Sequence, residues 1–155
     1  MKKIKKYIPE VFGAIFCLSL GILSGYIAHA GDTLWYQSLI KPTITPPTWI
    51  FGPIWTIIYI LMGIALGKII KIKNDLDLIK LFALQFFCNS IWSYLFFGIH
   101  KIDFALYDIM LLWATLIALL IKTYRYKIIF LLLLPYFIWT TFAYILNLQI
   151  FVLNS

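Results

Sequence analysis

Charged residues are scarce in this sequence, and acidic residues are the scarcest of them. Only 12% of its 155 residues are charged, and just six are Asp or Glu. A soluble domain of this size typically has about 25% charged residues, which help to cover its surface. With 63% hydrophobic residues, the chain cannot cover itself with polar side chains. The composition therefore predicts an integral membrane protein, folded as one domain over residues 1–155.

Cysteine and histidine are rare as well, with two of each. Cys17 and Cys88 lie inside apolar segments, where cysteine packs as a small apolar side chain. His29 and His100 have no second ligand at metal-binding spacing, so no metal site is predicted. The sequence also contains no nucleophile and base at catalytic spacing and no phosphate-binding glycine loop. A dedicated enzyme, an obligatory cofactor and nucleic-acid binding are therefore not expected.

Long apolar stretches, by contrast, make up most of the chain. A helix of about 20 apolar residues crosses the hydrocarbon core of a bilayer. Five stretches of this kind occur, at about residues 9–28, 46–67, 78–97, 104–121 and 128–151. Their connections are short except for the first, residues 29–45. We predict an all-α bundle of five transmembrane helices in contact with membrane lipid.

The positions of Lys and Arg predict how the bundle is oriented. If the five stretches alternate in direction, only Lys41 and Lys101 of the thirteen Lys and Arg residues fall on the side opposite the N-terminus. Basic residues mark the cytoplasmic side of a membrane protein. We therefore expect the N-terminus in the cytoplasm, and the C-terminus and the loop at residues 29–45 outside. In a bacterium this places the chain in the inner membrane.

The outer loop leads into an unusual entrance to the second stretch. The segment KPTITPPTWIFGPIWT, residues 41–56, has four prolines and two tryptophans. Pro46 and Pro47 suit the first turn of a helix, where a missing N–H costs nothing, and Thr45 is then a suitable N-cap. Prolines also reduce the conformational freedom of the unfolded chain. We expect a stiff loop over the outer ends of the helices.

Aromatic and polar residues recur at helical spacing inside the stretches. Phe51, Trp55 and Tyr59 are four residues apart and share one face. Similar faces are predicted for Gln85, Asn89, Trp92 and Phe96, for Asp108 and Leu111, and for Tyr136, Trp139, Ala143 and Asn147. Polar groups in hydrocarbon usually face the bundle interior. The pattern predicts an interior lined by indole rings with a few polar groups, which suits a flat and partly polar ligand.

Each of these features also has a purely structural interpretation. Aromatic faces are typical of helix packing and lipid contact, and Asn and Gln often join membrane helices by hydrogen bonds. Asp108 lies one turn from the outer end of its helix, where it can reach water or a neighbouring loop. The pairs Gly21-x-x-x-Gly25 and Gly63-x-x-x-Gly67 are typical of close packing between helices or between subunits.

Five motifs in order carry a family resemblance: WYQSLIKPTITPPTW, FGPIWTIIYILMG, CNSIWSYLFFG, FALYD and LPYFIWTTFAYILN. Over about residues 21–148 the chain resembles the TspO/MBR family. This family comprises the bacterial tryptophan-rich sensory proteins and the mitochondrial translocator protein, or peripheral-type benzodiazepine receptor. The resemblance implies a five-helix homodimer with a pocket below the first loop. It also implies binding of porphyrins, such as protoporphyrin IX or haem, and of other lipophilic ligands.

The resemblance and the helical faces together predict the site. In the family, the positions of Trp55 and Trp139 face the pocket and are implicated in light-dependent porphyrin breakdown. The predicted ligand-binding residues are Phe51, Gly52, Ile54, Trp55, Tyr59, Asn89, Trp92, Phe96, Phe104, Asp108, Leu111, Trp139, Ala143, Leu146 and Asn147. The predicted lid residues are Asp32, Trp35, Pro46, Pro47 and Trp49.

The sequence departs from the family pattern at several positions. Ile44 and Phe104 stand where relatives have tryptophan. The sterol motif that follows the fifth helix needs a tyrosine and then a basic residue, but Leu148 and Val152 occupy those places. Sterol recognition by that motif is therefore not expected.

The main functional hypothesis is a porphyrin-binding membrane protein that acts in tetrapyrrole sensing, buffering, transport or photoprotection. One alternative is light-dependent porphyrin degradation that uses Trp55 and Trp139. The other is a transporter of lipid-type or sterol-type molecules, although the chain has no sign of the inverted repeats that are common in transporters.

Overall fold

The computed structural model describes residues 7–30, 33–72 and 75–155, and in these ranges the chain is helical with no strand. The helices are α2 (Ile8–Ala30), α3 (Thr33–Ser38), α4 (Phe51–Ile70), α5 (Leu76–Ser93), α6 (Ile102–Thr123) and α7 (Lys127–Leu153). A 3₁₀ turn, η1 (Thr48–Ile50), leads into α4, and a π-helical turn, η2 (Tyr94–Gly98), follows α5.

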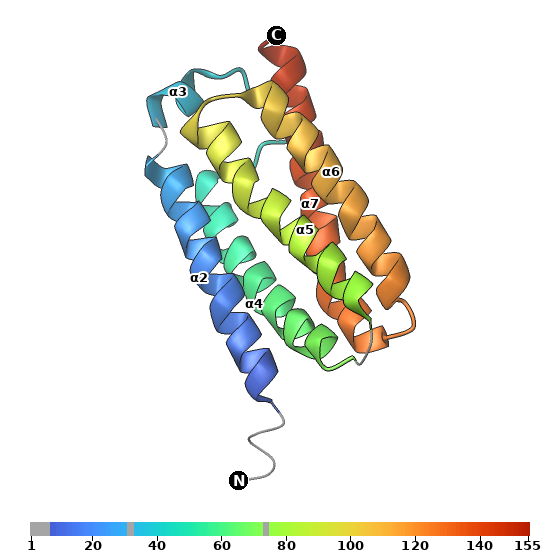
Figure 1. The fold of residues 1–155 in the computed structure, drawn as a ribbon. Helices are drawn as coiled ribbons and strands as arrows, with labels where there is room; N and C mark the ends of the chain where they lie inside the picture. The colour runs from blue at the N-terminus through green and yellow to red at the C-terminus, as the bar shows by residue number, and fades with distance from the viewer. Residues whose placement is uncertain (1–6, 31–32, 73–74) are drawn as a thin grey trace.

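The prediction of five membrane-spanning helices is confirmed. By length and composition, α2, α4, α5, α6 and α7 can each cross a bilayer, with η1 adding to α4 and η2 to α5. The helices run along one another, and the start of α2 and the end of α7 lie at opposite ends of the bundle (Figure 1). Which end faces the cytoplasm stays a prediction from the distribution of Lys and Arg.

The five long helices close into a ring in the order α2, α4, α7, α6, α5 (Figure 1). Met62 of α4, Leu112 of α6, and Leu133 and Tyr136 of α7 are buried inside it. On the outside, large apolar side chains such as Phe12 of α2 are exposed. An exposed apolar surface of this extent marks contact with a membrane. The chain is therefore an integral membrane protein whose interior is shared mainly by α4, α5, α6 and α7.

Helices α2 and α4 pack along a seam of glycines. Carbon atoms added at Gly13, Gly63 or Gly67 would clash with the backbone of the other helix, as would happen in an alanine variant. At Gly21 an added carbon would instead clash with the Tyr59 ring, whereas at Gly25 it would meet no atom within 4 Å. The pair Gly63 and Gly67 therefore packs helices within the chain, as small residues often do in membranes.

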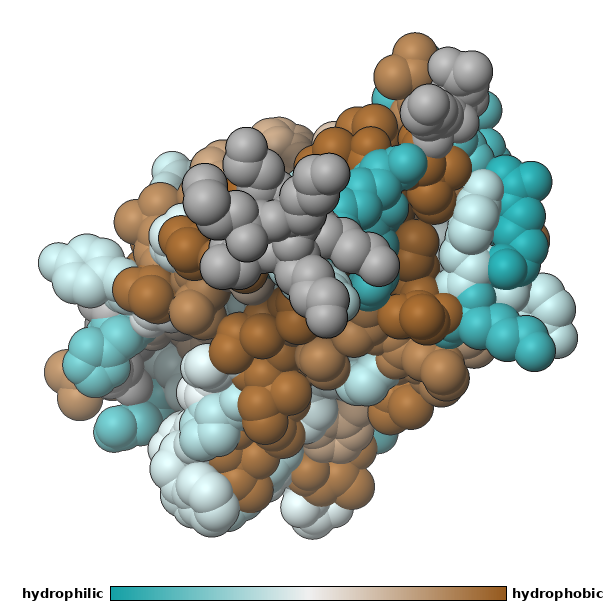
Figure 2. Space-filling view, turned by 90° about the horizontal axis from the view of Figure 1, so that it is seen from below, coloured by the Kyte–Doolittle hydropathy of each residue, from teal (hydrophilic) through white to brown (hydrophobic). Residues whose placement is uncertain are grey.

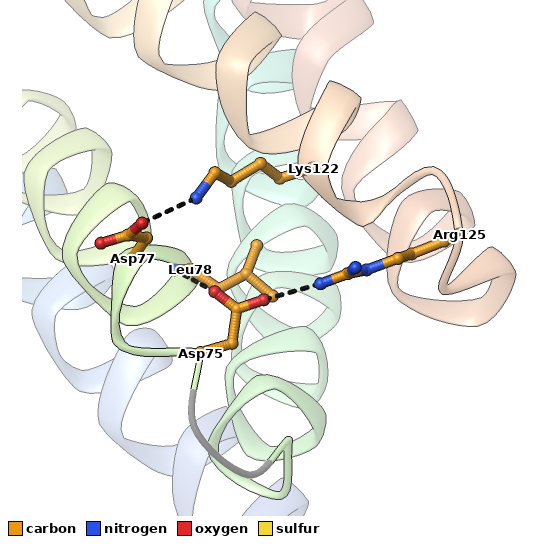
Figure 3. Close-up of polar contacts among 5 residues, drawn as sticks. All are labelled: Asp75, Asp77, Leu78, Lys122 and Arg125. Carbon is orange, nitrogen blue, oxygen red and sulfur yellow. Dashed lines mark hydrogen bonds and ion pairs between the residues drawn. The ribbon is translucent and has the colours of Figure 1, made fainter.

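The end of the bundle that carries Tyr7 is held by ion pairs. Glu10 of α2 pairs with Lys71 at 2.6 Å and lies 3.8 Å from Lys68. Across the bundle, Asp77 pairs with Lys122 at 3.1 Å and Asp75 pairs with Arg125 at 3.0 Å (Figure 3). Viewed onto this end, hydrophilic patches alternate with hydrophobic surface (Figure 2). The same end thus collects charges from the loops that join α4 to α5 and α6 to α7.

The outer loop differs from the prediction in two ways. It contains the short helix α3, and Pro46 and Pro47 precede the helical turns rather than starting them. Pro47 has an extended backbone with ψ of 140°, and the residue before a proline is disfavoured in helical geometry, which excludes Pro46 from a helix. Thr45 does not cap the helix, because its N–H and its hydroxyl both donate to the Pro42 carbonyl. The predicted helix start at residue 46 was therefore wrong.

Candidate functional site

An aromatic cluster lies where α4 meets α7. The Trp55 ring is 5.6 Å from the Tyr59 ring on its own helix and 6.2 Å from the Tyr136 ring of α7, measured between centroids. One turn earlier on α4, Phe51 makes an edge contact of 5.7 Å with Trp139. Offset and edge-to-face arrangements at these distances stabilise aromatic pairs. The spacing of four residues on α4 thus brings the two predicted site tryptophans into one cluster.

Two hydrogen bonds cross the interior beside this cluster. The Tyr59 hydroxyl donates to Asn89 Oδ1 at 2.6 Å and joins α4 to α5. The Trp92 indole N–H donates to Asn147 Oδ1 at 2.9 Å, while Asn147 Nδ2 donates to the Ile102 carbonyl at 3.3 Å. Both asparagines are buried. They therefore join membrane helices by hydrogen bonds, as the purely structural interpretation of Asn predicted. They also face the interior, as the helical spacing predicts.

Several other buried polar atoms have no hydrogen-bond partner among the described residues. They are Asp108 Oδ2, Tyr136 OH, Trp139 Nε1, Thr140 Oγ1, Gln85 Oε1 and His100 Nε2. A buried polar group left unpaired costs about 1–3 kcal/mol. Tyr136 and Thr140 are one turn apart on α7 and almost completely buried, and Asp108 lies beside Cys88 of α5. The interior therefore offers unpaired donors and acceptors to a bound molecule.

Helix α3 lies over a second aromatic cluster at the outer end. The Trp35 ring stacks on His100 with 4.1 Å between centroids, and makes an edge contact of 5.6 Å with Phe96. Phe96 in turn stacks on Trp92 at 5.2 Å. His100 has a positive φ of 58° in the turn between η2 and α6. The predicted lid residue Trp35 therefore contacts one predicted site residue, Phe96, which in turn stacks on another, Trp92.

Tyr36 extends this cover on the same helix. Its ring contacts Phe97 at 5.5 Å, and the Lys41 ammonium group lies 4.6 Å from its centroid. Burial raises the pKa of the Tyr36 hydroxyl, so the side chain stays neutral. A neutral aromatic side chain at this position closes the outer end of the bundle without adding a charge to it.

The C-terminal end of α7 fastens the outer loop. Asn154 Nδ2 donates to the Ile40 carbonyl at 2.9 Å, and its Oδ1 accepts from the Ile40 N–H at 2.9 Å. This paired bond joins positions 114 residues apart in the sequence. It ties the loop to α7 between α3 and the prolines. Asn154 therefore joins the loop that is predicted to be a lid to the end of α7.

We expect Asn154→Ala to loosen the outer loop while leaving the bundle folded. Three side-chain hydrogen bonds are lost, two with Ile40 and one to the Ile150 carbonyl within α7. The two with Ile40 hold the loop, and together they contribute about 1–3 kcal/mol. Limited proteolysis between residues 34 and 48 should become faster by about fivefold or more. The control is Ser155→Ala, which removes a hydroxyl from the adjacent residue that bonds only within α7. Equal cleavage rates in both variants would mean that the Asn154 hydrogen bonds do not hold the outer loop.

The other predicted residues lie at different depths. Phe51, Ile54, Trp55, Trp139 and Ala143 are partly buried, whereas Leu146 is buried. Exposed positions are Gly52, Phe104, Leu111, Pro47 and Trp49, and Pro46 is partly buried. Asp108 is partly buried and faces the interior rather than the outer loop. Asp32 lies outside the described residues. The binding roles of all these residues stay predictions.

Some residues of the site were not singled out from the sequence. Thr140 follows Tyr136 by one turn, so the helical spacing could have found it. Asn154 and His100 give no local signal, because their partners, Ile40 and Trp35, are distant in the sequence. Cys88 was read as a packing residue, which its burial agrees with. In the described ranges, no three His, Cys, Asp or Glu residues come together as a group that could hold a metal ion.

Comparison with known proteins agrees with this arrangement. The TspO/MBR family model matches residues 13–153. The chain is 38% identical to tryptophan-rich protein TspO of Chlorobaculum tepidum, with 89% of this chain and 90% of the relative covered. It is 36% identical to TspO of Archaeoglobus fulgidus, with coverage of 89% and 92%. Identity to human translocator protein is 30%, with coverage of 91% and 87%. The match covers nearly the full length of the chain, which therefore belongs to the TspO/MBR family.

Proposed function

We propose that this chain binds porphyrins, such as protoporphyrin IX or haem, and other flat lipophilic molecules in the outer half of its bundle. It would act there in tetrapyrrole sensing, buffering, transport or photoprotection. One observation carries the proposal: two partly buried tryptophans, Trp55 and Trp139, lie beside buried polar atoms that have no partner in the described chain. The names of relatives such as human translocator protein agree with a role in moving or detecting a ligand.

The aromatic cluster supports a flat ligand. Trp55 is in ring contact with Tyr59 and Tyr136, and Trp139 with Phe51. A planar molecule can replace one of these contacts by stacking on the same face, at little cost in conformational entropy, because the rings are already ordered. A tetrapyrrole is a planar molecule with two such faces.

The unpaired polar atoms support a ligand that is partly polar. Tyr136 OH, Thr140 Oγ1, Trp139 Nε1 and Asp108 Oδ2 lie on the neighbouring helices α6 and α7. A free-base porphyrin has pyrrole N–H groups at its centre, and natural porphyrins have carboxylates at the edge. A ligand that bonds these protein atoms recovers part of the cost of burying them unpaired. A pure hydrocarbon would recover none of it.

Entry of such a ligand would require movement at the outer end. Tyr136, Asn89 and Leu112 are buried, so side chains fill the middle of the bundle. At Gly52 of α4, however, an added side-chain carbon would meet no atom within 4 Å. The outer loop above is held by a few contacts, mainly those of Trp35 and Asn154. We propose that opening of this loop admits the ligand between α4 and α7.

The test is a titration of the detergent-purified protein with protoporphyrin IX in the dark, followed by tryptophan fluorescence. We expect saturable quenching for the unmodified chain. Trp55→Phe and Trp139→Phe should each weaken binding about fivefold, because each loses roughly 1 kcal/mol of ring contact. The double variant should lose about 25-fold if the two effects add. Darkness keeps porphyrin photochemistry out of the measurement.

Trp113→Phe serves as the matched control. Trp113 is also partly buried, but its indole N–H is already bonded to Thr141 Oγ1 at 2.9 Å. Its ring contacts Phe137 and Tyr144 rather than Trp55 or Trp139. Its substitution should leave porphyrin affinity unchanged. Quenching that does not saturate and is the same in all these proteins would mean that porphyrin only partitions into detergent, and the proposal would fail.

A further inference from the structure

A groove opens between α6 and α7 and runs from Phe137 towards the turn that joins the two helices. It has a volume of about 330 Å³ and is lined by Ile117, Leu120, Ile121, Tyr124, Phe130 and Phe137. Seven residues of α6 separate its two ends, which corresponds to about 10 Å along the helix axis. Every lining residue is apolar or aromatic. The groove therefore suits part of a hydrocarbon chain and offers almost nothing to a polar molecule.

The groove is held open by ordered aromatic side chains. Tyr124 makes an edge contact with Phe130, with 5.6 Å between centroids and an angle of 87°. At the other end, Phe137 stacks on Trp113 at 6.0 Å. Tyr124 and Ile121 are exposed to more than two thirds. A tyrosine in this position is typical of the membrane interface, where its ring meets hydrocarbon and its hydroxyl meets headgroups.

Basic residues lie close in sequence to Tyr124, which marks one end of the groove. Lys122 lies in the last turn of α6, Arg125 lies in the turn that follows, and Lys127 begins α7; all three are exposed. Two of them reach acidic partners at the start of α5: Lys122 pairs with Asp77, and Arg125 pairs with the N-cap residue Asp75 (Figure 3). Lys80 also lies near Asp77. Four basic groups thus face two acidic groups, which leaves this corner of the bundle positively charged.

These ion pairs do not prevent the cations from binding a ligand. The Arg125 and Asp77 side chains are about 70% exposed, and surface ion pairs typically contribute less than about 1 kcal/mol. Asp75 is also occupied at the start of α5, where its Oδ1 accepts from the Leu78 N–H at 3.3 Å. An arriving phosphate can therefore share Arg125 and Lys122 and take Lys127, for which no side-chain partner is found in the described chain.

We propose that this groove and its basic turn form a binding site for one anionic phospholipid. An acyl chain occupies the groove, and the phosphate meets Lys122, Arg125 and Lys127. An anionic lipid fits this site better than a neutral one, because the apolar groove ends beside basic residues at the depth of the headgroups. Basic residues next to a membrane each favour anionic lipid by about fivefold. The site is distinct from the porphyrin site and does not depend on it.

Native mass spectrometry of the full chain tests this. The protein is released from mild detergent with equal amounts of dioleoyl phosphatidylglycerol and dioleoyl phosphatidylcholine. We expect phosphatidylglycerol adducts to exceed phosphatidylcholine adducts by at least fivefold. Arg125→Gln with Lys127→Gln should bring the ratio close to one. Ile121→Trp, which fills the groove with an apolar side chain, should reduce the phosphatidylglycerol adduct itself by a similar factor.

Lys101→Gln is the matched control, because Lys101 is an exposed cation at the opposite end of the bundle. It should leave the lipid ratio unchanged. An unaltered far-ultraviolet circular dichroism spectrum in every variant would show that the bundle is folded. Equal adducts of both lipids in the unmodified chain, or the same loss in Lys101→Gln, would overturn the proposal. It would also be overturned if Ile121→Trp dissociated a dimer without changing the lipid adducts, since a second copy would then cover the groove.

Discussion

Gly63→Ala is expected to lower the thermal unfolding midpoint of the detergent-purified chain by about 2–12 °C. The added methyl group would clash with the Gly13 carbonyl and with the backbone of Ala14. Backbone cannot rotate away as a side chain can, so α2 and α4 must move apart. Overpacking of this kind costs about 1–3 kcal/mol, and 1 kcal/mol corresponds to about 2–4 °C for a chain of this length.

The control for this variant is Gly25→Ala on α2. Both changes add one methyl group within a helix, where alanine is favoured over glycine by about 1 kcal/mol. At Gly25 the new carbon would meet no atom within 4 Å, so the midpoint should stay the same or rise. Circular dichroism during heating measures both variants. If the two midpoints moved equally, the α2–α4 seam would not depend on the absence of a side chain at Gly63.

Asn147→Leu is expected to destabilise the chain by about 1–2 kcal/mol, or about 3–6 °C. Asn147 is 1% exposed and is bonded to Trp92 of α5 and to the Ile102 carbonyl of α6. Leucine has a similar size, but it leaves the Trp92 N–H without its acceptor. Hydrogen bonds between membrane helices contribute about 0.6 kcal/mol on average, whereas an unpaired buried donor costs about 1–3 kcal/mol. The cost of the unpaired Trp92 N–H is therefore the larger part of the expected loss of stability.

Gln149→Leu provides the matched change two residues later on α7. Gln149 is partly buried and makes no side-chain hydrogen bond to a described residue. Its replacement should shift the midpoint by less than about 2 °C. Near-ultraviolet circular dichroism should also change only in Asn147→Leu, because the Trp92 ring loses the bond that orients it. An unchanged signal and midpoint in that variant would mean that packing alone holds the three helices together.

The helices of this protein could be predicted well from local patterns. Each span is an apolar run of sufficient length, and a spacing of three or four residues puts Trp55 with Tyr59 and Asn89 with Trp92 on single faces. These signals are local, because a membrane helix satisfies its own backbone hydrogen bonds. The start of α4 was the exception. Consecutive prolines fit the beginning of a helix in general, but here the backbone of Pro47 is extended and the helical turns begin after it.

Composition, apolar length and helical spacing were thus sufficient for the class of fold and for the inward faces of α4, α5 and α7. The partners on those faces depended on the tertiary structure. The bonds between Tyr59 and Asn89, and between Asn154 and Ile40, join segments 30 and 114 residues apart. The groove between α6 and α7, and the seam that needs Gly63, likewise exist only where two helices meet. Periodicity states which way a side chain points, but what it meets depends on how the helices pack.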